Sequence, residues 1–111
     1  MIARGATVIV SSGSGVSRKP RPAIVIQAAD FDFPETVIVV PLTGQLVDDN
    51  MIMPLLTPDP QNGIEGVSRA MIHRMGAVRK SDIGRVIGNL SREDIEKVDM
   101  ALSLVLGLNA N

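Results

Sequence analysis

The sequence predicts a mainly β protein, a small barrel of about five or six short strands that ends in one helix. Short β-branched runs separated by Gly, Pro and Asp recur through most of the chain, and helical spacing of apolar residues appears only near its end. The 111 residues, 45% of them hydrophobic, suffice for one core and are too few for two. We therefore expect residues 1–111 to form a single domain. With two Phe as the only aromatic residues, its core must consist of Val, Ile, Leu and Met.

The first half of the chain contains three expected strands. Ala6–Ser11 is short and rich in β-branched residues, and the Gly- and Ser-containing Ser11–Ser17 after it is typical of a loop. Pro22–Ala28 predicts a second strand, with Pro at the first position, where its missing N–H matters least. After a turn region at Asp30–Glu35, Thr36–Pro41 is apolar on both faces, so we expect it to be a central strand.

The second half continues the pattern with shorter elements. Met51–Leu56 predicts a fourth strand, and the Pro- and Gly-containing Thr57–Gly66 predicts a loop. Arg69–Met75 alternates as a strand does, Ser81–Ile83 fits a single helical turn, and Arg85–Leu90 fits a last strand. The expected strand at 69–75 divides its side chains between two faces, with Ala70, Ile72 and Arg74 on one and Met71, His73 and Met75 on the other.

The helix is predicted by its two ends and by the spacing between them. Ser91 fits an N-cap with Asp94 three residues later, as in a capping box, and Gly107 fits the residue that follows a helix. Acidic residues lie in the first turns, where the helix dipole favours negative charge. Apolar residues follow at helical spacing, namely Ile95, Val98, Leu102 and Val105.

Several classes of chemistry lack the residues they need. The chain has no Cys, which excludes disulfides, thiolate catalysis and Cys-type metal sites. His73 is the only histidine and has no carboxylate cluster near it in sequence, so we expect no metal and no cofactor. A Ser-His-Asp hydrolase would need a Gly-x-Ser-x-Gly turn before a helix, and the glycines match no phosphate-binding fingerprint.

The sequence also gives no sign of a membrane or export segment. Residues 1–5 lack the apolar region of a signal peptide. The most apolar stretches, Thr36–Leu42 and Met100–Leu108, are far shorter than the ~20 residues that a spanning helix needs. We therefore expect a soluble, cytoplasmic protein with no membrane partner.

Basic residues are concentrated although the formal net charge is only −1. Two basic regions could together form a groove for phosphates, while acidic residues collect elsewhere in the chain. Ordinary solvated surface charges are the alternative. The regions consist of Arg18, Lys19 and Arg21 in the first, and Arg69, Arg74, Arg79, Lys80 and Arg85 in the second.

Two short features carry the best candidates for binding a phosphate. Arg21 stands between two prolines at a strand start, so a stiff backbone would present its guanidinium for bidentate contact. Thr43 follows an apolar strand and precedes a glycine, so its hydroxyl and nearby N–H groups could bind a phosphate oxygen. The alternatives are a simple surface arginine and a turn hydroxyl bonded to its own backbone.

Together these features identify a resemblance to the MazF/PemK family of toxins. Its specific part is Arg-Pro-Ala leading into an apolar strand, with Pro-x-Thr at the end of the next strand. The resemblance extends over nearly the whole chain. Its segments are Gly5–Val8, Arg21–Gln27, Val40–Thr43, Gly84–Ser91 and Leu106–Leu108.

This resemblance implies an SH3-like small barrel of the MazF/CcdB type with an added helix, working as a homodimer. Family members are endoribonucleases that cleave single-stranded RNA at short motifs, and a cognate antitoxin inhibits them by laying its flexible C-terminal tail over the active groove. The family's catalytic arginine and threonine fall on Arg21 and Thr43. We expect further contacts to the substrate from Arg18, Lys19, Arg69 and His73.

The implied reaction needs no metal, because the 2′-OH of RNA can attack the adjacent phosphorus and leave a 2′,3′-cyclic phosphate and a 5′-OH. Arg21 is always protonated, so we expect it to stabilise negative charge in the transition state rather than to act as a base. One departure concerns Arg69 and His73, where many relatives carry Gln and Asp. His73 could shuttle a proton or be a partly buried strand residue.

Two other functions remain compatible with this fold. A CcdB-type gyrase poison would bind protein without catalysis, but its action is tied to a C-terminal Trp-Gly-Ile, and this chain has no Trp. A catalytically silent homologue would only bind RNA or antitoxin. The presence of Arg21 and Thr43 favours the enzyme.

Overall fold

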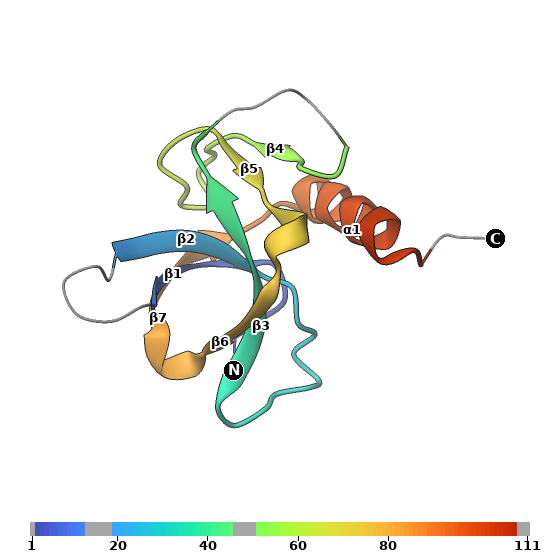
Figure 1. Cartoon of the computed structure of the whole chain (residues 1–111). Coiled ribbons are helices and arrows are strands. Elements are labelled where there is room, and N and C mark those ends of the chain that lie inside the picture. Colours follow the sequence, from blue (N-terminus) through green and yellow to red (C-terminus); the bar gives the residue numbers. More distant parts are fainter. Residues whose placement is uncertain (1, 13–18, 46–50, 109–111) are drawn as a thin grey trace.

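A strongly curved antiparallel sheet with one helix packed at its end forms the molecule (Figure 1). The structure is a computed structural model that describes residues 2–12, 19–45 and 51–108. The mainly β class with a C-terminal helix is confirmed. The strands are β1 (Ala6–Ser12), β2 (Lys19–Val25), β3 (Thr36–Thr43), β4 (Leu55–Leu56), β5 (Ser68–Ala70), β6 (Gly76–Arg79) and β7 (Ile83–Asn89). The helices are α1 (Arg92–Leu106) and two 3₁₀ turns, η2 (Ile72–Arg74) and η3 (Lys80–Asp82).

The order of the strands explains why the sheet curls. The main path runs β4-β5-β3-β2-β1-β7, and β6 also pairs with β3. β6 and β7 therefore flank the group β3-β2-β1 on its two sides, yet only the short η3 separates them in the chain. A link this short brings the two sides close together, so the sheet bends into a barrel-like shape.

β3 is the central strand that its apolar sequence predicts. It pairs with β2 on one side. On its other side it pairs first with β6, over Thr36–Val39, and then with β5, over Leu42–Thr43. Its far end therefore reaches beyond the curl and leads into the region of β4 and β5 (Figure 1).

The alternating side chains of the sheet fill two cores. One core lies inside the curl, and the other lies between the sheet and α1. No aromatic residue belongs to either core, as the composition predicts, and Phe31 and Phe33 are exposed. The inner core contains Ala6, Val8, Val10, Ala23, Val25, Val37 and Val39, while the other includes Ile24, Val40, Leu42, Leu56, Ile72, Val98, Ala101 and Leu102.

Both predicted ends of α1 are confirmed. The Ser91 hydroxyl accepts a hydrogen bond from the Asp94 backbone N–H at 3.2 Å. Gly107 closes the helix in the left-handed conformation with φ 72°. Arg4 fixes the helix to the start of the chain, because its guanidinium contacts Asp99 at 2.5 Å and the Ile26 carbonyl at 2.9 Å. None of the helices in the described ranges has the length and apolar character to cross a membrane.

The predicted strand at 69–75 is wrong beyond Ala70. There the chain leaves β5, and the Met71 N–H bonds to the Pro41 carbonyl at 2.9 Å. Ile72 is fully buried in the core beside α1, and a 3₁₀ turn starts at this residue. Packing against a helix that is distant in sequence therefore overrides the local alternation. The chain then forms β6, a strand that the sequence analysis did not identify.

Other boundaries differ by a few residues. Of the expected strand Met51–Leu56 only the last two residues pair, and a turn occupies its start. Pro54 lacks the N–H needed for a ladder, but its carbonyl accepts from Ala70 at 3.0 Å. The second strand begins and ends three residues earlier than predicted, the predicted helical turn lies at η3, and the last strand starts at Ile83. Most of the expected loop Ser11–Ser17 lies outside the described residues.

Candidate functional site

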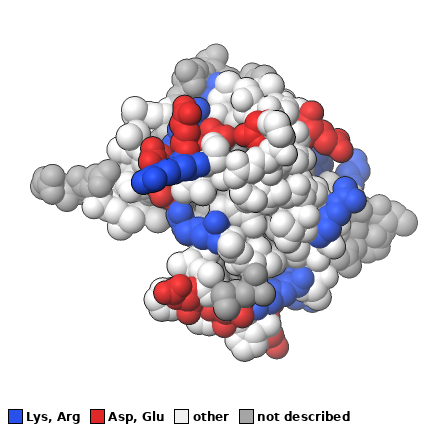
Figure 2. Space-filling model, turned by 180° about the vertical axis from the view of Figure 1, so that it is seen from behind, with Lys and Arg blue, Asp and Glu red and all other residues white. Residues whose placement is uncertain are grey.

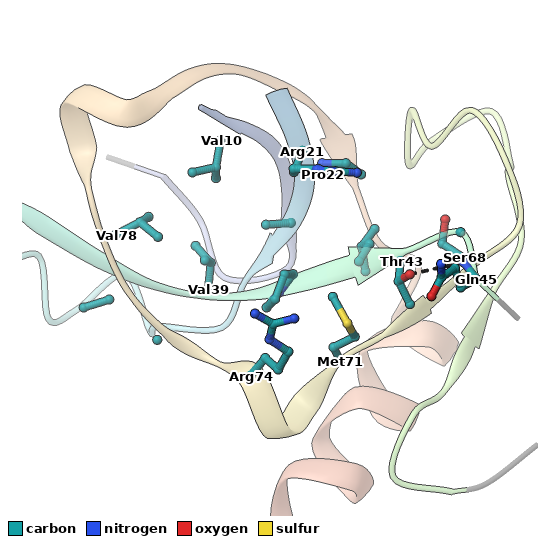
Figure 3. Close-up of a pocket in the computed structure, with 16 residues that line it drawn as sticks. Val10, Arg21, Pro22, Val39, Thr43, Gln45, Ser68, Met71, Arg74 and Val78 are labelled. Carbon is teal, nitrogen blue, oxygen red and sulfur yellow. Dashed lines mark hydrogen bonds between the residues drawn. The ribbon is translucent and has the colours of Figure 1, made fainter. Parts of the chain in front are cut away.

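A pocket of about 800 Å³ lies where β2, β3 and the η2–β6 segment meet (Figure 3). The β2–β3 ladder covers Ala23–Val25 and Val39–Pro41. Beyond this ladder the start of β2 and the end of β3 diverge, as Figure 1 shows. The lining combines apolar and polar residues, namely Val10, Arg21, Pro22, Ala23, Val39, Pro41, Leu42, Thr43, Gly44, Gln45, Ser68, Met71, Arg74, Gly76, Ala77 and Val78.

Arg21 is held on one wall of the pocket by β2. It lies opposite Val10 in the β1–β2 ladder, and its side chain is exposed. Pro20 and Pro22 restrict the backbone on either side of it and donate no N–H, so this part of β2 pairs with β1 alone. The prolines thus leave Arg21 on a stiff strand beside open space, as the sequence predicts.

Thr43 is the last residue of β3 and lies beside Arg69 of β5. It is half-buried, and its hydroxyl oxygen accepts a hydrogen bond from the Gln45 N–H at 3.1 Å. This is the turn bond that the sequence analysis offered as an alternative. The bond fixes the oxygen and uses it as acceptor, so the hydroxyl hydrogen can still be donated into the pocket.

Arg74 lines the same pocket from η2, although the sequence placed it only in a basic region and not among the expected substrate contacts. In a 3₁₀ turn, successive residues point about 120° apart, because one turn takes about three residues. Ile72 points into the core, so His73 and Arg74 occupy the other two directions. Figure 3 shows the Arg74 side chain reaching from η2 toward β3. The basic region at 69–85 was the signal in the sequence. The strand predicted over 69–75 would point the Arg74 side chain differently from the 3₁₀ turn that the structure has there.

The charge of the pocket is positive. Its lining includes Arg21 and Arg74 and no acidic residue among those that the structure describes. Neither guanidinium has an ion pair or side-chain hydrogen bond within the described ranges. In contrast, acidic and basic side chains are interspersed on the face that Figure 2 shows. The pocket therefore suits an anionic ligand.

Three of the remaining predicted contacts, Lys19, Arg69 and His73, do not line the pocket. Lys19 is exposed at the start of β2, and Arg18 lies outside the described residues. Arg69 is only 5% exposed, and its guanidinium donates to the Met53 carbonyl at 2.8 Å. His73 is exposed on η2. The structure thus brings Arg21 and Thr43 together in one pocket and gives no support to a direct substrate contact from Arg69 or His73.

One carboxyl group away from the pocket has a shifted pKa. Lys80 Nζ donates to the Asp32 carboxylate at 2.5 Å, and this hydrogen bond lowers the pKa of Asp32 below its usual value. The pair connects the loop after β2 to η3 and lines a second, smaller cavity. Among residues 2–12, 19–45 and 51–108, no three His, Cys, Asp or Glu side chains are grouped as metal ligands would be.

The chain is similar to known toxins in sequence and in fold. A family model described as "PemK-like, MazF-like toxin of type II toxin-antitoxin system" matches residues 4–106. The "Probable endoribonuclease MazF" of Mycolicibacterium smegmatis is 31% identical over 105 residues, which cover 95% of this chain and 96% of the relative.

Two solved structures share the fold at low sequence identity. One is titled "Endoribonuclease in complex with its cognate antitoxin from Mycobacterial species" and has a TM-score of 0.77 at 16% identity, with full coverage of both chains. The Mycobacterium tuberculosis toxin MazF-mt6 has a TM-score of 0.76 at 18% identity, covering 92% of this chain and 96% of its own. Together with the family match, these findings show that the chain belongs to the PemK-like, MazF-like toxins of type II toxin–antitoxin systems.

Proposed function

We propose that this chain is an endoribonuclease toxin that cuts single-stranded RNA in the pocket between β2, β3 and η2. The observation that carries the proposal is that Arg21 and Thr43, on two different strands, line one pocket without an acidic residue in its described lining. The family membership and the relative named as an endoribonuclease give further support. The proposed catalytic residues are Arg21 and Thr43.

The pocket suits a reaction in which the substrate supplies its own nucleophile. In RNA the 2′-oxygen attacks the neighbouring phosphorus, the bond from phosphorus to the 5′-oxygen breaks, and the 2′-OH proton is lost while the leaving oxygen gains one. The products are a 2′,3′-cyclic phosphate and a 5′-OH. The reaction requires no metal ion or cofactor, and DNA is not a substrate because it lacks the 2′-OH.

Each polar group has a task that its position allows. Arg21 carries a permanent positive charge at the pocket wall, so it would stabilise the extra negative charge on the phosphate oxygens in the transition state. Thr43 would donate its hydroxyl hydrogen to a phosphate oxygen, because its oxygen is already held by the Gln45 N–H. Neither group is suited to remove the 2′-OH proton, so we assign them stabilisation and positioning.

The lining of the pocket favours an unpaired strand. It includes apolar side chains beside the arginines, among them the half-buried Met71 and Val78. A splayed base can lie on such a surface while the arginines hold the phosphates, whereas a duplex keeps its bases stacked inside. The exposed Lys19 would extend the positive surface along the RNA beyond the pocket, and Arg18, its neighbour in sequence, stays a proposed substrate contact.

The same pocket suggests how the toxin is inhibited. We propose a cognate antitoxin whose flexible C-terminal tail lies over the pocket and blocks access of RNA. The fold neighbour titled as a complex with its cognate antitoxin supports this proposal. We further propose that the chain acts as a homodimer in the cytoplasm, in line with its family.

The test is cleavage of a long single-stranded RNA by purified protein in EDTA, with the 5′ ends of the products mapped. We expect discrete cuts that leave 5′-OH ends and that disappear in Arg21→Ala. Because Arg21 is exposed, this variant should melt at the parental temperature. Cleavage at parental rate by a folded Arg21→Ala protein would overturn the assignment, as would a folded parent that leaves RNA intact.

A further inference from the structure

We propose that Arg74 is a second phosphate-binding residue of the pocket, which holds the RNA phosphate next to the one at Arg21. This inference rests on the proposed function and adds to it a binding residue that the MazF-like motif does not contain. Arg74 lines the same pocket as Arg21 and Thr43 and is exposed to solvent. A pocket with two guanidinium groups can bind two phosphates of one strand.

The direction of Arg74 is set by packing. The Ile72 side chain is fully buried in the core beside α1, and the Met71 N–H is bonded to Pro41 of β3. The turn is closed by the bond from the Arg74 N–H to the Met71 carbonyl at 2.9 Å. With the turn anchored in this way, the backbone of Arg74 is fixed at the pocket wall. A fixed backbone lowers the entropy that binding costs.

The charge around Arg74 also favours a phosphate. Within the described ranges its guanidinium has no acidic partner, unlike Arg4, which contacts Asp99, and Lys80, which contacts Asp32. An arginine with no such partner loses no ion pair when an anion binds. Arg21 also has none there, and no acidic residue from the described part of the chain lines the pocket that the two cations share. The backbone of a nucleic acid strand, with one negative charge per nucleotide, would neutralise both cations.

The size and lining of the pocket fit a ligand larger than one phosphate. Its volume of about 800 Å³ is near the upper end of ordinary ligand pockets, which reach roughly 1,000 Å³. Arg21 comes from β2 on one wall and Arg74 from η2 on another, and apolar residues such as Met71 and Val78 line the space as well (Figure 3). A base that packs against these apolar residues, with a phosphate at each arginine, would contact both the apolar and the charged residues of the lining.

The experiment measures how tightly a single-stranded RNA binds at several salt concentrations. The probe is a fluorescent RNA that carries the cleavage site of the parent, with 2′-deoxyribose at the cut nucleotide so that it cannot be cleaved. For each protein the slope of log affinity against log salt is recorded. One lost phosphate contact should reduce this slope by about 0.7.

We expect Arg74→Ala to weaken RNA binding about tenfold at low salt and to reduce the salt slope by about 0.7. Arg74→Lys keeps the charge and should restore the slope. Arg92→Ala removes the same charge at a strongly exposed site outside the pocket lining and should match the parent. In cleavage assays Arg74→Ala should raise KM and leave kcat nearly unchanged, because a neighbouring phosphate is held equally in substrate and transition state.

Two results would overturn the inference while leaving the proposed function intact. One is an Arg74→Ala protein that cuts and binds RNA like the parent. The other is weaker binding with an unchanged salt slope, which would assign Arg74 to a base edge. A folded parent that neither cuts nor binds RNA would instead overturn the proposed function and this inference with it.

Discussion

The loop Thr57–Gly66 and the pocket both place polar groups against the same sheet. In the loop the Asn62 side chain is buried and paired, whereas the guanidinium groups of the pocket are exposed and have no partner among the described residues. Asn62 in the loop is 0% exposed, and both polar atoms of its side chain are hydrogen-bonded. Its amide oxygen accepts from the Asp59 and Ile64 N–H groups at 3.3 and 2.9 Å, and its amide nitrogen donates to Thr57 at 3.0 Å. In the pocket, Arg21 is exposed and without a protein partner among the described residues.

Glycines make the close docking of the loop possible. A side chain on Gly88 of β7 would meet the Gln61 carbonyl oxygen at 2.3 Å, and Gly63 adopts a positive φ of 66° against Ile87. The Thr7 hydroxyl adds a bond of 2.6 Å to the Asn62 carbonyl. Buried polar groups that are all paired stabilise one fold, whereas exposed unpaired cations are available to a ligand. We therefore expect Asn62 to contribute to stability and Arg21 to contribute to ligand binding.

The largest expected effect is on catalysis. Arg21→Ala should reduce kcat by about 10²–10³-fold, the usual cost of removing a group that stabilises transition-state charge. Its thermal melting should stay at the parental temperature, because no bond within the described fold is lost. Single-turnover cleavage and a melting curve on the same preparation check both halves. If Arg21→Ala lost its activity because it unfolded, Arg21 would belong to the residues that stabilise the fold, which would contradict its assignment to binding and catalysis.

Asn62→Ala should show the reverse behaviour. The change leaves the Asp59 and Ile64 N–H groups and the Thr57 carbonyl with no side-chain partner, so we expect a loss of about 3 kcal/mol in the free energy of unfolding. Urea denaturation measures this value, with Gln61→Ala at an exposed neighbouring position as the control. The folded fraction should keep the parental kcat. An Asn62→Ala protein as stable as the parent would contradict the role of the loop.

Thr43→Val tests the hydroxyl alone. The substitution removes the donor that is expected to reach the phosphate, and we expect kcat to fall about tenfold. Thr43→Ser keeps the hydroxyl and should retain most of the activity. If valine and serine were equally active, the Thr43 hydroxyl would serve only its bond to Gln45.

The smallest expected effect is that of His73→Ala. His73 is exposed and lies outside the pocket lining, so kcat and KM should stay within about twofold of the parent and stability should hardly change. Cleavage measured from pH 5 to 9 would reveal a proton-transfer role through a lost limb of the profile. A large fall in kcat would contradict this expectation and would support a role for His73 as a proton shuttle.

Local patterns predict most elements of the fold, although they place the second strand three residues too late, so that it begins just after Arg21. β1, β3 and α1 follow from β-branched runs and from the caps Ser91 and Gly107, and these features depend only on neighbours in sequence. Arg21 lies near the start of β2 and Thr43 at the end of β3, so the pairing of these two strands suffices to bring them into one pocket. Their catalytic roles remain predictions.

The features that the sequence did not predict depend on contacts between distant residues. η2 and β6 replace the expected strand because Ile72 packs in the core beside α1, about twenty residues further on. Arg69 is buried, and its guanidinium donates to the carbonyl of Met53, 16 residues earlier in the chain. The place of Arg74 in the pocket follows from the same turn. No local periodicity encodes these contacts.

The most direct test of the account compares two RNAs that differ by a single oxygen. Both contain the mapped cleavage site, and one of them has 2′-deoxyribose at the nucleotide before the cut. Parent protein in EDTA should cut the all-ribose RNA to a 5′-OH product and leave the deoxy-substituted RNA intact at that site. Equal cutting of both RNAs would show that the 2′-OH is not the nucleophile and would contradict the proposed role of the Arg21 and Thr43 pocket.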